Sequence, residues 1–280
     1  MKKQGIKILI LSTILLIIPI IISLTLFLYN NSLEKIITIF GSKEEYDLIS
    51  CFSLWWYLFR YDLFSYIAYL LPIIITIMSC YSFFHLYRSG TIFNIIQREK
   101  YSKLMIKEIL LSWSKNIILP IIMLLFFIIS IILFPNTHVF DLTGRLAYIY
   151  QIGHPYMNII NPFLFVFLYL AIVFLFGIII TNLGIILTRF IKKFNLLVIG
   201  NFILVIIIES IGNFIVGPIV KSLTGYDRMA NGFSLYNIYY LDAIPSLWWE
   251  FLFSIITIII TSIIIYLIYK DKEKVLNSYE

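Results

Sequence analysis

Charged residues are scarce in this sequence of 280 residues. Asp, Glu, Lys and Arg together make up 13% of it, whereas an ordinary soluble domain contains about 25%. Hydrophobic residues make up 61%, and they come in uninterrupted runs of about 20 residues with the charges crowded between them. This composition excludes a soluble globular protein and indicates that lipid solvates most of the chain.

Cysteine and histidine are also rare. The two cysteines form no Cys-x-x-Cys pair and the three histidines are scattered, which excludes a disulfide framework and gives no metal-ligand spacing. No Gly-x-x-x-x-Gly-Lys-[Ser/Thr] loop occurs, so the chain has no P-loop to cradle nucleotide phosphates. No nucleophile, base and orienting group can be assembled at one membrane depth. We therefore expect no catalytic residue, no metal site and no enzymatic activity.

Six stretches are long and apolar enough to cross a membrane. A helix of about 20 residues covers about 30 Å of hydrocarbon, and it satisfies its own backbone polar groups there. The stretches, with ends set to within a few residues, cover 6–29, 63–86, 116–134, 162–187, 194–216 and 249–269. We predict an all-α polytopic membrane protein, with residues 1–280 forming a single transmembrane domain of six helices.

The charges between these stretches predict the orientation. Six spans place both termini on one side, where 15 basic residues fall, against six on the other side. Acidic residues show the opposite bias, with five on the side of the termini and nine on the other. Basic residues collect on the cytoplasmic face of membrane proteins. Both termini are therefore predicted to be cytoplasmic, in a multi-pass protein of the cell (plasma) membrane.

The predicted outer segments cover 30–62, 135–161 and 217–248. The second half of the first segment, 48–61, is expected to lie on the membrane surface. The last segment, broken by Gly and Pro, is expected to form a re-entrant or interfacial element. Both are rich in aromatic residues, which favour the level of the head groups. Two roles stay open for these aromatics, a belt that only fixes depth or part of an outer gate. The residues concerned are Trp55, Trp56, Tyr57, Tyr236, Tyr239 and Tyr240.

The inner segment 88–110 contains a short amphipathic pattern. Its apolar residues Ile92, Phe93, Ile95 and Ile96 recur at helical spacing, which predicts a short helix with one apolar face. The basic run that follows would hold this helix against an anionic leaflet at about 1 kcal/mol per basic side chain. Two interpretations stay open, a juxtamembrane anchor or a docking helix whose apolar face enters a groove on a cytoplasmic partner.

Polar and small residues gather in the fifth predicted span. Glu209 is the only charged residue deep in a span, and an ionised carboxylate in hydrocarbon costs a few kcal/mol unless it is paired, wet or protonated. The other members, which lie on or beside the same helical face, are Asn201, Ser210, Gly212 and Asn213. The face is either a helix–helix or subunit interface, or a path for substrate or protons.

Proline and glycine add two expectations. Pro19 and Pro72 lie inside the first and second predicted spans, where each removes a helical hydrogen bond and bends its helix. Gly177 and Gly184, seven residues apart in the fourth span, share a helical face and are interpreted as sites of close helix packing.

The layout resembles the permease subunit of a bacterial ABC-2 type transporter, in particular an exporter. The resemblance covers nearly the whole chain. It rests on six spans with both ends inside, on Arg88-Ser89-Gly90-Thr91 at the start of the amphipathic segment, on the basic break after it, and on Lys103–Glu108 leading into the third span. It implies a short cytoplasmic coupling helix between helices 2 and 3, seated in a groove of an ATPase. The residues of that helix are Gly90, Thr91, Ile92, Phe93, Ile95, Ile96 and Arg98.

The resemblance also implies partners. Two cytoplasmic ABC ATPase subunits would bind ATP and Mg, this chain would bind no cofactor, and a second permease half, either a copy of the chain or a paralogue, would complete a dimer. Only residues 1–5 precede the first span, whereas many polysaccharide exporters carry a longer amphipathic helix there. Peptide, lantibiotic-immunity and drug exporters therefore match better.

We expect a permease that exports an amphipathic or apolar cargo, such as a peptide or bacteriocin, a lipid or a drug. Its surroundings are membrane lipids, and no nucleic acid is expected as a partner. A non-enzymatic membrane immunity or sensor protein that acts without ATP is the alternative, and an intramembrane enzyme is a third reading.

The charge bias makes the orientation testable. In a variant without native cysteines, Lys103→Cys is expected to react with a membrane-impermeant maleimide only after the membrane is opened, because residue 103 is predicted to be cytoplasmic. Lys43→Cys, predicted to be outside, is expected to react in intact cells. The measurement is the fraction of protein that acquires the label. Labelling of Lys103→Cys in intact cells would reverse the predicted orientation.

Overall fold

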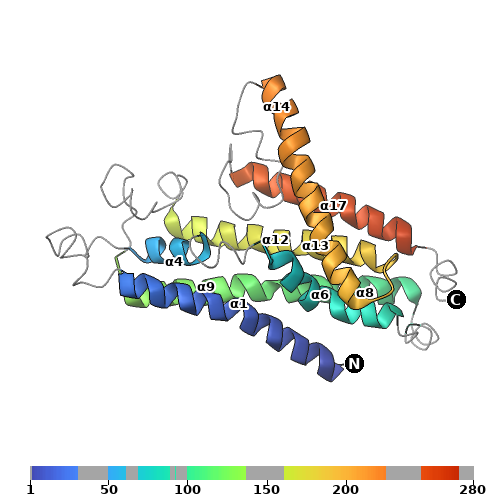
Figure 1. Ribbon diagram of the computed structural model, residues 1–280, viewed down its shortest axis with the longest axis horizontal. Helices are drawn as coiled ribbons and strands as arrows, with labels where there is room; N and C mark the ends of the chain where they lie inside the picture. The colour runs from blue at the N-terminus through green and yellow to red at the C-terminus, as the bar shows by residue number, and fades with distance from the viewer. Residues whose placement is uncertain are drawn as a thin grey trace. The chain divides into compact units, whose positions relative to one another are not determined.

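The computed structural model describes residues 2–30, 50–60, 69–88, 92, 100–136, 161–224 and 247–270. These residues are helical apart from short turns and include no strand, which confirms the all-α class. Figure 1 shows the helices as coiled ribbons. They are α1 (Lys2–Asn30), α4 (Cys51–Arg60), α6 (Leu71–Arg88), α8 (Tyr101–Ser114), η1 (Lys115–Ile117), α9 (Ile118–Leu133), α12 (Pro162–Thr188), α13 (Phe194–Ile211), η2 (Gly212–Val216), α14 (Gly217–Thr224) and α17 (Leu247–Tyr269).

Five helices of the described residues are long and apolar enough to cross a membrane, and they overlap five of the six predicted spans. The second predicted span, 63–86, is represented by α6, which begins only at Leu71, and residues 61–68 lie outside the described part of the chain. A sixth span and the orientation of the termini therefore stay predictions. The five helices are Gln4–Tyr29, Tyr101–Leu133, Pro162–Thr188, Phe194–Leu223 and Glu250–Tyr269.

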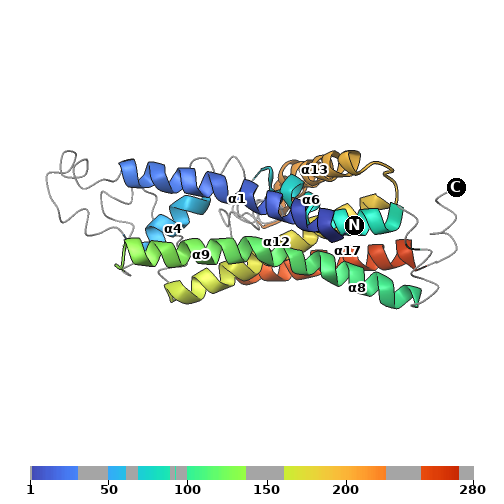
Figure 2. The same cartoon turned by 90° about the horizontal axis from the view of Figure 1, so that it is seen from below.

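The helix that contains the third predicted span begins before the apolar run. Helices α8, η1 and α9 follow one another without a gap, so that Tyr101–Leu133 is a single helix of 33 residues, drawn in green in Figure 2. At 1.5 Å per residue it is about 50 Å long, against about 30 Å of hydrocarbon. The helix therefore tilts or extends beyond the hydrocarbon, and the predicted coupling segment 88–110 overlaps its first residues.

A proline explains the short turn inside this helix. Pro120 has no N–H to donate to the carbonyl of Asn116, and its ring crowds that carbonyl. The chain tightens into a 3-10 turn at Lys115–Ile117, where the Ile118 N–H donates to the Lys115 carbonyl, three residues back. After this turn the α-helix resumes, so the proline changes the winding of the helix without ending it.

A second irregular turn extends the fifth span. Residues Gly212–Val216 form a π turn, closed by the Gly217 N–H donating to the Gly212 carbonyl five residues back. Pro218 follows directly, and because it lacks an N–H the ordinary ladder cannot close there. The helix nevertheless continues to Thr224 through α14, as Figure 1 shows in orange. The helix therefore runs past the predicted end of the span at residue 216 and into the predicted outer segment 217–248.

Pro19 and Pro72 were both predicted to lie inside a helix, and the structure agrees only for Pro19. Pro19 lies inside α1, as predicted. Pro72 is the second residue of α6, where the N–H that it lacks would have no partner within the helix in any case. The bend expected at Pro72 is therefore wrong.

The chain divides into two compact units. Unit 1 contains Met1–Ser12, Leu70–Ile118 and Ile172–Glu280, and unit 2 contains Thr13–Tyr69 and Leu119–Ala171. Each unit has buried side chains of its own, and each is described separately.

In unit 2, helix α4 is packed into protein. Trp55 is 0% exposed and Trp56 is 2% exposed. The Trp55 indole N–H donates to the Met123 carbonyl at 2.9 Å, and its ring lies 5.5 Å from that of Phe127 and 5.7 Å from that of Tyr169. Both tryptophans therefore contact protein on nearly all sides, which is not the half-exposed setting that an aromatic belt requires.

In unit 1, the middle of α12 is central. Every residue from 176 to 185 is buried, so all faces of this helical stretch contact protein. Gly177 and Gly184 permit the approach of neighbouring helices, as expected from the sequence. A Cβ atom on Gly177 would lie 2.9 Å from the Asn116 Cβ, and one on Gly184 would lie 2.6 Å from the Cys80 Sγ.

A pair of alanine variants tests this close packing. Gly177→Ala is expected to lower the midpoint of thermal unfolding in detergent, because the new methyl group meets a Cβ atom that cannot turn away. Gly200→Ala is the matched control, since its methyl group would meet only the flexible end of Ile191, at 2.9 Å. Both variants gain about 1 kcal/mol of helix propensity. Equal midpoints for the two variants would contradict the packing argument.

Candidate functional site

Polar side chains from six elements meet inside unit 1, around the centre of α12. In hydrocarbon a polar group without a partner costs several kcal/mol, so such a cluster forms only where the groups satisfy one another. We call this cluster the polar layer. Its members are Thr76, Ser79, Trp113, Asn116, Thr181, Asn182, Asn201 and Thr261, from α6, α8, η1, α12, α13 and α17.

Thr181 is the first branching point of the polar layer. Its side chain is 0% exposed and its hydroxyl accepts a hydrogen bond from the Asn116 amide at 2.9 Å. The same oxygen lies 2.8 Å from the Ser79 hydroxyl and 2.8 Å from the Gly177 carbonyl, which share its one hydrogen. One threonine therefore joins α12 to both α6 and η1.

Asn182 is the second branching point. Its amide oxygen accepts a 2.7 Å hydrogen bond from the indole N–H of Trp113, and its amide nitrogen donates to the Thr261 hydroxyl at 2.9 Å. Because Trp113 belongs to α8 and Thr261 to α17, this side chain joins three helices.

Asn201 is the predicted site residue that the polar layer contains. It is 0% exposed, and its amide nitrogen donates to the Thr76 hydroxyl at 2.6 Å and to the Ile180 carbonyl at 3.1 Å. Asn201 therefore lies where α6, α12 and α13 meet.

The remaining predicted residues of this span lie elsewhere on the helix. Glu209 is partly exposed, and its carboxylate accepts a hydrogen bond from the Asn213 amide at 2.9 Å. Ser210 donates to the Ile206 carbonyl at 2.8 Å, and Gly212 is buried where the π turn begins. The structure does not bring Glu209 to Asn201, because the two are more than two helical turns apart.

Lys115 is a polar residue that the sequence did not single out. It lies within the long helix Tyr101–Leu133, and its ammonium donates to the Ser82 hydroxyl at 2.9 Å. From the sequence, Lys115 is only one of the inner basic residues that predict the orientation. Its position directly before Asn116 and a long apolar run could have identified it, because an ionisable residue within a membrane helix is a functional candidate by default.

Two buried acceptors in the polar layer have no partner among the described residues, the amide oxygens of Asn116 and Asn201. Each lies on an asparagine whose nitrogen is already used, so the layer retains the capacity to accept hydrogen bonds from water or from a ligand. No group of three or more His, Cys, Asp or Glu in the described part of the chain is arranged to hold a metal.

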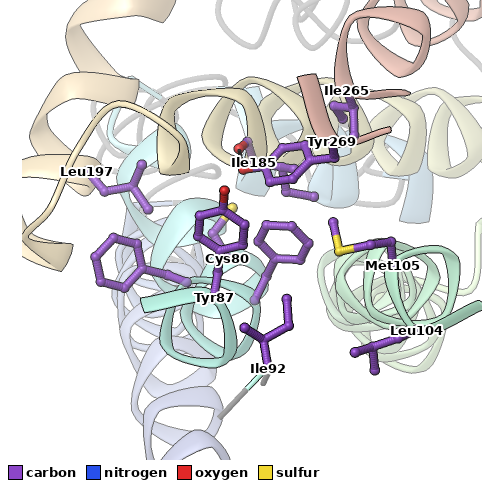
Figure 3. Close-up of a cluster of buried hydrophobic side chains, with 11 residues drawn as sticks. Cys80, Tyr87, Ile92, Leu104, Met105, Ile185, Leu197, Ile265 and Tyr269 are labelled. Atoms are coloured by element: carbon purple, nitrogen blue, oxygen red, sulfur yellow. Dashed lines mark hydrogen bonds between the residues drawn. The ribbon is translucent and has the colours of Figure 1, made fainter. Parts of the chain in front are cut away.

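One end of unit 1 contains a buried apolar cluster, which we call the end cluster. Ile92, the described residue of the predicted coupling helix, is 0% exposed within it. Figure 3 shows Ile92 between the helix that carries Tyr87 and the helix that carries Leu104. The other members are Cys80, Phe83, Phe84, Met105, Ile185, Leu197, Ile265 and Tyr269. Ile92 thus contacts the core of its own chain.

Polar contacts hold the same end together. The Tyr101 hydroxyl donates to the Tyr269 carbonyl at 2.8 Å, and the Tyr269 hydroxyl donates to the Ile185 carbonyl at 2.9 Å. The Arg88 guanidinium donates to the carbonyls of Thr188 and Arg189 at 2.9 and 3.0 Å. These four contacts join the ends of α6, α8, α12 and α17.

A groove runs between α8 and α17. Its volume is about 410 Å³, within the range of small-molecule pockets, about 300 to 1,000 Å³. The walls are apolar and aromatic, with one lysine, Lys270, at the end of α17. The side chains that form the walls include Tyr101, Met105, Ile109, Trp113, Ile265 and Tyr269.

Several predicted site residues lie outside the described part of the chain. Among the coupling residues these are Gly90, Thr91, Phe93, Ile95, Ile96 and Arg98, and among the outer aromatics they are Tyr236, Tyr239 and Tyr240. The side chain of Tyr57 is also outside the description.

No family model, curated protein or solved structure matches the chain. Its function is therefore argued from its residues and their geometry.

A threonine pair tests the polar layer. Thr181→Val keeps the size of the side chain but removes the bonds to Asn116 and Ser79, and we expect a loss of about 1 kcal/mol in unfolding free energy. Thr257→Val is the control, because the Thr257 hydroxyl donates to the Phe253 carbonyl of its own helix. Chemical unfolding in mixed micelles measures both. Equal losses would show that Thr181 does not join helices energetically.

Proposed function

We propose that this chain is the permease subunit of an ABC-2 type transporter in the plasma membrane, with both termini cytoplasmic. It exports an amphipathic or apolar cargo, and it forms a dimer with a second permease half. Two separate cytoplasmic ATPase subunits bind ATP and Mg²⁺ and hydrolyse the nucleotide. The chain itself catalyses no reaction and binds no cofactor.

The observation that supports this proposal most is the burial of Ile92 in the end cluster. A helix that only rests on the leaflet needs no side chain in the protein core. A coupling helix does need one, because it must pass motion to the helices that move the cargo. Ile92 is 0% exposed in a cluster of side chains from α6, α8, α12, α13 and α17, so a displacement of this residue would disturb the packing of that cluster.

The helix that follows the coupling segment supports the same reading. Residues Tyr101–Leu133 form one helix. Its first residue, Tyr101, donates a hydrogen bond to the carbonyl of Tyr269, the last residue of α17. A continuous helix transmits a push along its axis, whereas a loop would absorb it. Closure and opening of the ATPases would in this way bias the bundle between inward-open and outward-open states.

The groove between α8 and α17 supports the proposed class of cargo. Its walls are apolar and aromatic, and Lys270 is the charged residue among those that line it. Such walls suit a ligand with a large apolar part and a small polar part. They offer no series of charged groups along which an ion could pass.

Substitution of Phe93 tests the coupling. When the chain is co-expressed with its proposed ATPase partner, Phe93→Asp is expected to reduce the co-purified ATPase about 30-fold, because a buried aromatic anchor is worth about 2 kcal/mol or more. Phe190→Asp is the matched control, since Phe190 is 70% exposed in the turn after α12. ATP hydrolysis by the purified complex is the second measurement.

The results separate the two candidate functions. Equal ATPase recovery from the Phe93→Asp and Phe190→Asp variants would count against coupling through this segment. Immunity or resistance that persists in cells without the ATPase would favour the membrane immunity or sensor protein instead.

A further inference from the structure

A second cavity lies between the end of α6 and the start of α13, and we call it the basic pocket. It has a volume of about 660 Å³ and lies within unit 1. The two segments that form it are about 100 residues apart in the sequence. Its lining includes His85 and Arg88 from α6 and Lys192, Lys193, Phe194 and Leu196 from the start of α13.

The basic pocket is positively charged. Among the described residues, Arg88, Lys192 and Lys193 line it and no acidic residue does. The guanidinium of Arg88 is held in place by the carbonyls of Thr188 and Arg189, which are neutral and leave its charge intact. A pocket lined by one sign of charge attracts an anion from the surroundings.

The start of α13 adds to this preference for anions. The first backbone N–H groups of a helix have no helical acceptor, and Lys193 at the N-cap position supplies no side-chain cap. The Phe194 ring is fixed by contacts of 5.4 Å with Phe84 and 5.2 Å with Tyr81, measured between ring centroids. The pocket thus has a rigid aromatic side and a basic side.

An exposed apolar stripe begins at the edge of the basic pocket. Leu196, which lines the pocket, is 54% exposed, and Ile199 and Ile203 further along α13 are 52% and 49% exposed. Their spacing of three and four residues places them on one face. They lie within Phe194–Leu223, a helix apolar and long enough to cross a membrane, so this face meets lipid tails in a bilayer.

We propose that the basic pocket binds the phosphate head group of an anionic phospholipid whose acyl chain lies along Leu196, Ile199 and Ile203. The pocket alone would suit any phosphate. The stripe selects the phospholipid, because a soluble phosphate has no tail to cover it. Basic pockets between membrane helices are known to bind lipid head groups in this manner. The inference does not depend on an ATPase partner.

The test uses the full chain in detergent, titrated with phosphatidylglycerol and, separately, with phosphatidylcholine, with bound lipid counted by native mass spectrometry. The double variant Lys192→Gln and Lys193→Gln is expected to bind phosphatidylglycerol about 30-fold more weakly, from two lost charges. Binding of the zwitterionic lipid is expected to stay unchanged. Both lysines are exposed, so the thermal unfolding midpoint should equal that of the parent chain.

The matched control is Lys103→Gln with Lys107→Gln, two exposed lysines of α8 that do not line the basic pocket. An equal loss of phosphatidylglycerol binding in this control would overturn the proposal, because lipid binding would then depend on the net charge of the chain and not on the basic pocket. Glycerol phosphate that binds as tightly as the full lipid would also overturn it, since the stripe would contribute nothing. Recovery of a bound protein in place of lipid would assign the pocket to a partner and likewise overturn it.

Discussion

Around the middle of α12 every face is covered by protein, and two adjacent polar residues there must find all their partners inside the bundle. Thr181 bonds to groups of α6 and η1, and Asn182 bonds to groups of α8 and α17. Satisfying these two side chains therefore restricts where four neighbouring elements can lie. Gly177 leaves the space that brings Asn116 within reach of Thr181. Apolar contacts alone would not select one rotation of each helix about its axis. An apolar face can contact lipid tails as well as protein, because both are equally apolar.

The sequence allowed the helical class and five apolar spans to be predicted, since runs of this length have one stable form in hydrocarbon. It did not locate the ends of the helices. Apolar residues mark where lipid begins, whereas a helix ends where its hydrogen-bond ladder ends, and Tyr101–Ser114 and Gly217–Thr224 continue the ladder with more polar residues. Hydropathy also does not show whether an apolar side chain contacts lipid or other parts of the protein. Trp55 and Ile92 looked like surface residues by position, yet both are fully buried in the chain's own packing.

The candidate sites differ in how far the sequence alone predicted them. Asn201 stood out because an amide in an apolar run needs a partner, and the partner proved to be Thr76. Lys115 and the basic pocket were hidden among ordinary inner basic residues, because the sequence shows the side of the membrane but not which of these residues converge in space. Arg88 and Lys193 lie about 100 residues apart and line one cavity only through the packing of α13 on α6.

Burial of the two native cysteines has a chemical consequence for the whole chain. Cys51 and Cys80 are both 0% exposed, and burial raises the pKa of the Cys51 thiol above its ordinary value. Only the thiolate attacks disulfides and oxidants, so a thiol kept protonated and covered reacts slowly. We therefore expect the two thiols to react slowly with oxidants and to form no disulfide while the chain is folded.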